Sequence, residues 1–225
     1  MSSWWNKPRC VKIVVDTPGW FDIHAESLAT RIARHGDEVQ ILRDANRISS
    51  SDVTFYLSCM KITPPEILAR SRLNLVAHAS DLPKGRGFSP IVWQILNGEN
   101  TIPVSLLYAA DNVDSGDIVI QEKLKFEGHE LNEEIRNALG NIIVDMCERF
   151  LRSKEVPAGR SQVGEASWYP RRTWKDSELD PQLTIAEQFE ILRVVDNERY
   201  PAFIKFRGHT YKITITKTGD GGAPN

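Results

Sequence analysis

The segment Val11-Lys12-Ile13-Val14-Val15 is a short apolar run rich in β-branched residues, and the Pro18-Gly19 pair ends it. Apolar residues then recur at the spacing of an amphipathic helix, at Phe21, Ala25, Leu28 and Ile32. A strand, a turn and a helix in this order form the first half of a βαβ unit. The opening of the chain therefore predicts an α/β fold.

The same alternation of strands and helices continues along much of the chain. Strands are predicted at residues 38–42, 53–57, 73–77, 104–108 and 118–124, and helices at 64–70, 90–96 and 131–150. Strands that alternate with helices pair mostly in parallel, because each helix carries the chain back across a face of the sheet. We expect a Rossmann-like, mostly parallel sheet with flanking helices.

The composition changes after about Lys154, where prolines and glycines interrupt any continuous helix. Thr184 and Glu187 have the spacing of a capping box and predict a helix that runs to Leu192. Two apolar runs around Arg207-Gly208-His209 predict a β-hairpin. The sequence thus predicts a core at residues 1–153, a small helix and hairpin subdomain at 154–217, and a disordered tail at 218–225.

Composition limits the classes of function. A net charge of -2 offers no broad attraction to a phosphate backbone, so a long nucleic acid is not an expected partner. Cys10, Cys59 and Cys147 are scattered and the N-terminus lacks the apolar core of a secretion signal, which predicts a cytoplasmic protein. No run approaches the roughly 20 apolar residues that cross a bilayer, so membrane insertion is not expected. No histidine pair or Cys-x-x-Cys has ligand spacing, and no metal site is predicted.

Two polar side chains lie at predicted strand ends. His78 directly follows the strand at 73–77, and Asp114 lies in the loop between the strands at 104–108 and 118–124. Loops at the carboxyl edge of such a sheet converge on a crevice where ligands bind. An imidazole and a carboxylate can move a proton at neutral pH, so we predict that they form a catalytic pair. The simpler alternatives are a structural histidine and an ordinary Asp-Ser-Gly turn.

These residues belong to two motifs that resemble the formyltransferases that use 10-formyltetrahydrofolate. The first motif comprises His78, Ser80, Leu82-Pro83 and Arg86-Gly87, and the second is Asp114-Ser115-Gly116-Asp117. Further matches resemble the sugar N-formyltransferases, a branch with a core similar to that of methionyl-tRNA formyltransferase; they are Pro90, Trp93, Ile95, Gly98, Glu99 and parts of the segment from Arg171 to Phe203. The resemblance implies that residues 1–153 are the catalytic core.

The resemblance also implies roles for these residues, with one departure. His78 would assist proton movement, and Asp114 would hold or polarise His78. The family carries an asparagine two residues before the histidine, and Val76 stands at that place here. The missing hydrogen-bond donor could come from Asn74, Ser80, Asn112 or a backbone amide, and a purely structural role for Asn74 explains it equally well. We expect Val76→Asn to leave the reaction intact.

The remaining site residues follow from the resemblance and from their chemistry. Two loops resemble the walls of the folate site: Met60-Lys61-Ile62-Thr63 and Ala110-Asp111-Asn112-Val113. Lys84 and Arg86 are predicted to contact phosphates of the acceptor, although solvated surface charge is the alternative. Trp93 either stacks on the base of the acceptor or packs beneath the loop. Trp168, Tyr169 and the pair Arg171-Arg172 are further candidates.

The expected enzyme transfers a formyl group from 10-formyltetrahydrofolate to the amine of a nucleotide-linked amino-deoxy sugar, for surface glycan synthesis, and forms a homodimer. Four alternatives stay open. They are a methionyl-tRNA formyltransferase, for whose larger C-terminal domain residues 154–225 leave little room, a glycinamide ribonucleotide formyltransferase, a formyltetrahydrofolate hydrolase, and a non-catalytic module that binds folate or a nucleotide sugar.

Overall fold

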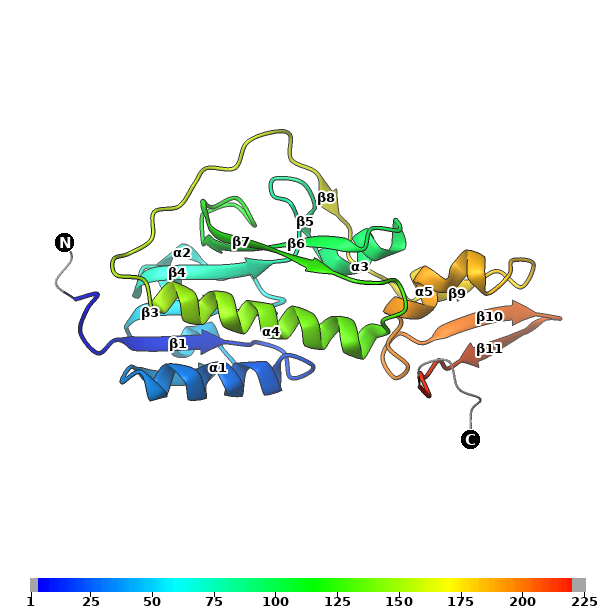
Figure 1. Ribbon diagram of the computed structural model, residues 1–225, viewed down its shortest axis with the longest axis horizontal. Coiled ribbons are helices and arrows are strands. Elements are labelled where there is room, and N and C mark those ends of the chain that lie inside the picture. Colours follow the sequence, from blue (N-terminus) through cyan, green and yellow to red (C-terminus); the bar gives the residue numbers. More distant parts are fainter. Residues whose placement is uncertain (1–3, 220–225) are drawn as a thin grey trace.

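The centre of the protein is a six-stranded sheet in the order β2-β1-β3-β4-β6-β7, in a computed structural model that describes residues 4–219 (Figure 1). Its strands are β1 (Cys10–Val14), β2 (Glu38–Leu42), β3 (Ser51–Tyr56), β4 (Ser71–His78), β6 (Thr101–Tyr108) and β7 (Ile118–Lys125). The first four strands of this order pair in parallel, while β6 and β7 join antiparallel. The predicted Rossmann-like, mostly parallel α/β sheet is confirmed.

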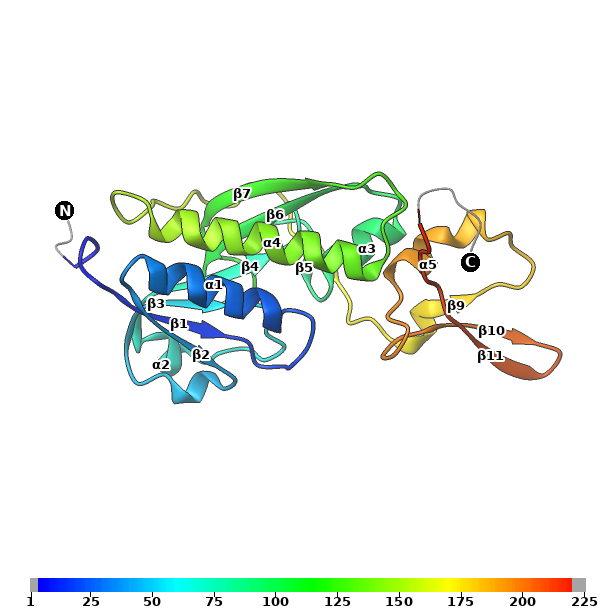
Figure 2. The same cartoon turned by 60° about the horizontal axis from the view of Figure 1, so that its bottom comes forward.

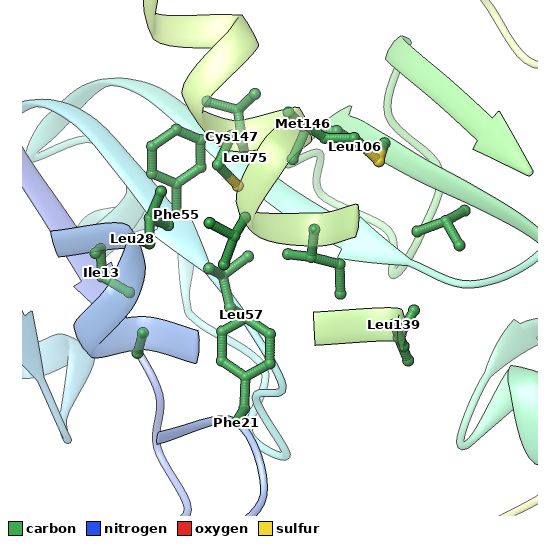
Figure 3. Packing of buried hydrophobic residues seen from close by; sticks show 14 of the residues in the cluster. Ile13, Phe21, Leu28, Phe55, Leu57, Leu75, Leu106, Leu139, Met146 and Cys147 are labelled. Carbon is green, nitrogen blue, oxygen red and sulfur yellow. The ribbon is translucent and has the colours of Figure 1, made fainter. Parts of the chain in front are cut away.

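Two long helices, α1 (Asp22–Arg34) and α4 (Asn132–Leu151), lie side by side on one face of this sheet (Figures 1 and 2). Their apolar sides and the strands enclose the main hydrophobic core, as Figure 3 shows for Ile13, Phe21, Leu28, Phe55, Leu57, Leu75, Leu106, Leu139, Met146 and Cys147. Alternate side chains of a strand point to opposite faces, so Val14 and Tyr56 lie in a second cluster on the other face. The short helix α2 (Pro65–Leu68) covers that cluster through Ile67.

The C-terminal part builds a small second layer beyond the N-terminal end of α4 (Figure 1). It holds a three-stranded sheet of β9 (Glu178–Leu179), β10 (Ala202–Phe206) and β11 (His209–Ile213), and the helix α5 (Phe189–Val194), which follows a 3-10 turn at Ala186–Gln188. These elements share a separate apolar cluster around Leu179, Leu192, Val195 and Ala202. The predicted helix and hairpin are therefore both present.

A buried arginine joins this subdomain to the core. The Arg193 side chain is 0% exposed and donates to Asn100 Oδ1 at 2.9 Å and to Glu190 Oε2 at 2.6 Å. Its Nη2 also lies 3.3 Å from Glu130 Oε2. The short helix α3 (Pro90–Leu96) packs against α5 nearby. Because the buried charge is balanced on both sides of the junction, Arg193 ties the two parts together.

Residues 154–170, which we call the return segment, run from the end of α4 back over the core to β8 (Trp168–Tyr169) (Figure 1). Pro157 O accepts a hydrogen bond of 2.6 Å from the Tyr108 hydroxyl, and Arg160 pairs with Ile118 through both backbone groups. β8 then pairs in parallel with β5 (Arg86–Gly87). The predicted boundary at residue 154 stays a prediction. The chain after it still forms hydrogen bonds with the core at Pro157, at Arg160 and along β8.

Two other expectations concern the limits of the chain and the membrane. The predicted disordered tail, 218–225, falls mostly on residues outside the described range. Among residues 4–219, no helix combines the length and the apolar composition that crossing a membrane requires. The homodimer stays a prediction.

Candidate active site

A cavity of about 1210 Å³ lies where the segments after β1 and β3, the end of β4 and the loop after β6 meet. His78 and Asp114 both line it. All eight residues of the two predicted folate loops, 60–63 and 110–113, line it as well. The structure thus brings residues from distant parts of the sequence to one cavity at the expected edge of the sheet.

His78 and Asp114 form a buried pair. Nδ1 of His78 lies 3.4 Å from Asp114 Oδ1, and the two side chains are 6% and 8% exposed. Nε2 of His78 lies 2.8 Å from the carbonyl oxygen of Gly85. A carbonyl oxygen can only accept, so we assign the permanent ring hydrogen to Nε2. Nδ1, beside the carboxylate, is therefore the nitrogen that carries no hydrogen in the neutral ring.

Asp114 is fixed by its backbone as well as by its side chain. Its φ of +53° is in the left-handed region, which aspartate tolerates better than most residues. Oδ2 accepts a 3.0 Å hydrogen bond from the amide of Gly87. A Cβ at Gly116 would collide with the carbonyl oxygen of Tyr108, so this turn requires glycine at the third position of its motif. The second motif is thus explained by the turn that presents Asp114.

Gln162 of the return segment supports this turn from outside. Its Nε2 donates to the carbonyl oxygens of Asp114 at 2.8 Å and of Gly116 at 2.9 Å. Its Oε1 accepts a 2.6 Å hydrogen bond from Nη2 of Arg86. The turn is therefore held on one side by Gly87 and on the other by Gln162.

The loop at 60–63 is organised by Asp16, which lies two residues after the end of β1. Oδ1 of Asp16 accepts from the amide of Met60 at 2.9 Å, and Oδ2 accepts from that of Lys61 at 2.8 Å. A carboxylate that accepts backbone amides gives strong, charge-assisted hydrogen bonds. Met60 and Ile62 stand 46% and 76% exposed and offer apolar surface to the cavity.

Asn74 does not reach the cavity. Its Nδ2 donates to Leu68 O at 2.9 Å, and its Oδ1 accepts a 3.3 Å hydrogen bond from the hydroxyl of Tyr56. Burial raises the pKa of this tyrosine to about 12, so its phenol stays protonated and donates. Asn74 is therefore held by protein partners outside the cavity, while Val76 lines the cavity with an apolar side chain.

Ser80 is also placed away from the cavity. It is 2% exposed, and within residues 4–219 its hydroxyl has no hydrogen-bond partner. Its Cβ lies close to Gly85, where an added Cβ would stand 3.1 Å away. Ser80 thus packs under the loop that follows His78 and does not line the cavity. Asn112 lines the cavity and is, by position, the better of the proposed amide donors.

The predicted acceptor-binding residues Lys84, Arg86 and Trp93 do not line the cavity, and the last two have protein partners. Arg86 bonds to Gln162, and its guanidinium lies 5.8 Å from the centre of the Trp168 ring. Trp93 donates to Pro170 O at 3.0 Å and stacks on Tyr169, so it packs beneath the loop. Lys84 is exposed and borders a separate small hollow. The prediction for Arg86 and Trp93 does not fit this geometry, because neither side chain lines the cavity and the Trp93 N–H already has a protein acceptor.

Other residues at the site were not predicted from the sequence. Asp16, Gln162 and Arg199 carry no local pattern, because each acts on a segment far away in the chain. Trp168, Tyr169, Arg171 and Arg172 do line the cavity, as their position after the core suggested. Within residues 4–219, no group of three or more acidic, histidine or cysteine side chains is placed to hold a metal ion.

Comparison with known proteins finds formyltransferases among both the curated sequences and the solved structures. Methionyl-tRNA formyltransferase from Clostridioides difficile (strain 630) is 31% identical over 75% of this chain and 56% of its own length. A methionyl-tRNA formyltransferase structure from Clostridium thermocellum has a TM-score of 0.79 at 24% identity and covers 95% of both chains. A 4-N formyltransferase from Francisella tularensis has a TM-score of 0.69 at 16% identity, over 92% of this chain and 97% of that one.

At these identities the structural likeness shows the fold alone. The chain spans about half the length of the curated relatives that it matches. Residues 16–143, more than half of the chain, match the family model described as formyl transferase, and they contain both motifs, His78 and Asp114. This protein belongs to the formyl transferase family.

Proposed function

We propose that this protein transfers a formyl group from 10-formyltetrahydrofolate to the primary amine of a nucleotide-linked amino sugar. The observation that carries the proposal is the buried pair of His78 and Asp114 beside the two loops of one large cavity. Ligand sites commonly have volumes of about 300–1000 Å³. A cavity of about 1210 Å³ leaves room for both reactants to meet.

The chemistry requires a bond from the amine nitrogen to the formyl carbon to form and the bond from that carbon to the folate nitrogen to break. The amine loses a proton and the departing nitrogen gains one. His78 can hold this proton at Nδ1, and the carboxylate of Asp114 at 3.4 Å stabilises the ring while it is charged. The hydrogen bond from Nε2 to Gly85 O fixes the plane of the ring during both steps.

The two loops fit a folate-type donor by their chemistry. Met60, Ile62 and Val113 give exposed apolar walls for a flat ring, and the backbone of both loops supplies donors and acceptors for its edge. Asp16 fixes the first loop through its amides, so this wall is formed before a ligand arrives. We assign the donor to this side of the cavity.

Methionyl-tRNA is the second candidate acceptor, because the curated sequence relatives are methionyl-tRNA formyltransferases. The sugar acceptor is supported by a 4-N formyltransferase neighbour, the Francisella tularensis enzyme, although a methionyl-tRNA formyltransferase structure matches this chain over a similar length. It is also supported by the C-terminal part of the chain, whose residues Arg199 and Tyr200 line the cavity and offer a cation and an aromatic ring to a nucleotide.

The test is an acceptor panel. Purified protein is incubated with 10-formyltetrahydrofolate and with nucleotide-linked amino sugars, methionyl-tRNA or no acceptor, and products are measured by mass spectrometry. We expect a mass gain of one formyl group on a sugar nucleotide. A gain on methionyl-tRNA alone would establish the second candidate, and formate release without any acceptor would identify a hydrolase. No reaction in any arm would contradict a formyl transfer activity.

A further inference from the structure

Four arginines line the cavity near the start of α4 and the C-terminal layer: Arg136, Arg171, Arg172 and Arg199. The one carboxylate among the described cavity residues of this region is Asp196. It is already engaged, because Oδ2 accepts from Arg136 Nη1 at 2.9 Å and Oδ1 accepts from the amides of Glu198 and Arg199, both at 3.0 Å. Asp196 therefore forms an ion pair with Arg136, whereas the other three arginines form no ion pair within residues 4–219.

Arg172 is a partly buried cation without an ion-pair partner in the described part of the chain. Its Nη1 donates to Val194 O at 2.7 Å and its Nη2 to Ser177 Oγ at 3.0 Å, while its Nε is buried and unpartnered there. Burial lowers the pKa of this guanidinium. Its neighbour Asp176 accepts from the amide and hydroxyl of Thr173 and attracts Arg172 through its charge without forming an ion pair with it. A desolvated cation of this kind favours an anion in the adjoining space.

Arg171 and Arg199 are exposed to the cavity and held by contacts that leave most of their N–H groups free. The Arg171 guanidinium lies 5.7 Å from the centre of the Phe88 ring. Arg199 Nη2 donates to Pro18 O at 3.2 Å, and its guanidinium lies against Gly19, where an added Cβ would stand 3.3 Å from Nη1. Neither forms an ion pair with a carboxylate within residues 4–219. Both can therefore present a planar set of donors to a ligand.

We propose that Arg171, Arg172 and Arg199 form a subsite for the diphosphate of a nucleoside diphosphate, which would hold the acceptor while its amine reaches His78. This inference deepens the proposed function and rests on it for the identity of the acceptor. Guanidinium groups match phosphate oxygens in shape and charge, and two or three of them balance the charge of a diphosphate. Trp20 and Tyr200, which line the cavity beside Arg199, offer aromatic surface for the nucleobase.

The test uses unreactive probes on the whole protein. Isothermal titration measures the affinity of UDP, dTDP and inorganic pyrophosphate for the wild type, for Arg171→Gln, for Arg199→Gln and for the double variant. We expect at least one nucleotide to bind, each single variant to weaken it about tenfold, and the double variant to weaken it further. Arg149→Gln is the matched control, because Arg149 pairs with Glu122 and does not line the cavity. Tetrahydrofolate affinity should be equal in all of these proteins.

Two results would overturn the subsite. One is that none of the three probes binds a wild type that binds tetrahydrofolate. The other is that the double variant binds all three probes as tightly as the wild type. This result would overturn the subsite even if the double variant bound tRNA more weakly. Weaker nucleotide binding in the variants, with no formyl transfer to any sugar nucleotide, would uphold the subsite and remove the proposed function. Formyl transfer to a sugar nucleotide, with the same acceptor KM in the double variant as in the wild type, would uphold the proposed function and remove the subsite.

Discussion

At the scale of single residues, the site depends on how tightly one turn presents one carboxylate. Asp114 has a left-handed backbone, accepts from Gly87 and faces His78. Asp114→Asn keeps the size of the side chain and removes its charge. We expect kcat to fall by about 10²–10⁴-fold, the usual contribution of a residue that assists proton transfer. Steady-state kinetics measure the loss, and an unchanged circular dichroism spectrum shows that the fold is intact. A fully active variant would remove Asp114 from the mechanism.

Gln162 gives a second prediction at this scale, because it touches the turn and not the cavity. Gln162→Leu removes both hydrogen bonds to the turn, so Asp114 should drift from His78. We expect kcat to fall about tenfold with KM values unchanged, since small errors in position are costly to catalysis. Gln40→Leu on the exposed strand β2 is the control and should behave as wild type. A kcat that falls only together with a lower melting temperature, or a change in KM alone, would contradict a positioning role.

The contrast between these residues shows what the sequence could predict. His78 and Asp114 belong to local motifs, and each stands beside a strand that its apolar run makes evident. Gln162 acts on Asp114 across 48 positions, and Asp16 acts on Met60 across 44, so neither carries a nearby signal. Arg86 shows a different limit. Its charge suggests a phosphate ligand, but the sequence could not show that its Nη2 donates to Gln162 and that its side chain does not line the cavity.

At the scale of elements, strands and helices could be predicted from the sequence more directly than the loops between them. The runs at 38–42 and 90–96 match β2 and α3 residue for residue, because β-branched or periodic apolar patterns end there at clear turns. The two loops at 60–63 and 110–113 are predicted to bind folate by resemblance alone, and the structure adds what holds the first loop in place. Its shape depends on the end of β1, where Asp16 receives the amides of Met60 and Lys61.

Asp16→Ala tests that dependence. Loss of the carboxylate leaves the loop at 60–63 without its anchor, and ordering it then opposes ligand binding. We expect the Kd for tetrahydrofolate to rise about tenfold, measured by calorimetry. Asp52→Ala is the matched control, since Asp52 accepts from the amide of Cys10 at the opposite end of the sheet. Unchanged affinity in Asp16→Ala would show that the loop is not a wall of the folate site.

At the scale of the whole molecule, the helices α1 and α4 cover the main hydrophobic core. One histidine between these helices should make the free energy of unfolding depend on pH. His24 of α1 is 6% exposed and packs on Gly140 of α4, where any Cβ would collide with the imidazole. Burial lowers its pKa from 6.5, with Asn137 partly opposing the shift. The folded state therefore binds a proton less readily than the unfolded chain, and stability falls as the pH drops below about 6.5.

We expect the melting temperature of the wild type to fall between about pH 7 and pH 5, and the fall to be smaller in His24→Gln, which cannot titrate. Differential scanning fluorimetry across this range measures both. His35→Gln is the control, because His35 is exposed and pairs with Glu148. The idea fails if His24→Gln loses stability with falling pH as steeply as the wild type does.

The return segment changes how shortened forms of this protein must be judged. Polypeptide ending at residue 153 would keep His78 and Asp114 in its sequence, yet it would lack Gln162, the Ser167 hydroxyl that receives the Gly85 amide, and the strand beside Arg86-Gly87. Inactivity of such a fragment would say nothing about where the acceptor binds. Restoring only residues 154–170 is the informative comparison, because that stretch separates the support of the catalytic groups from any contribution of the C-terminal layer.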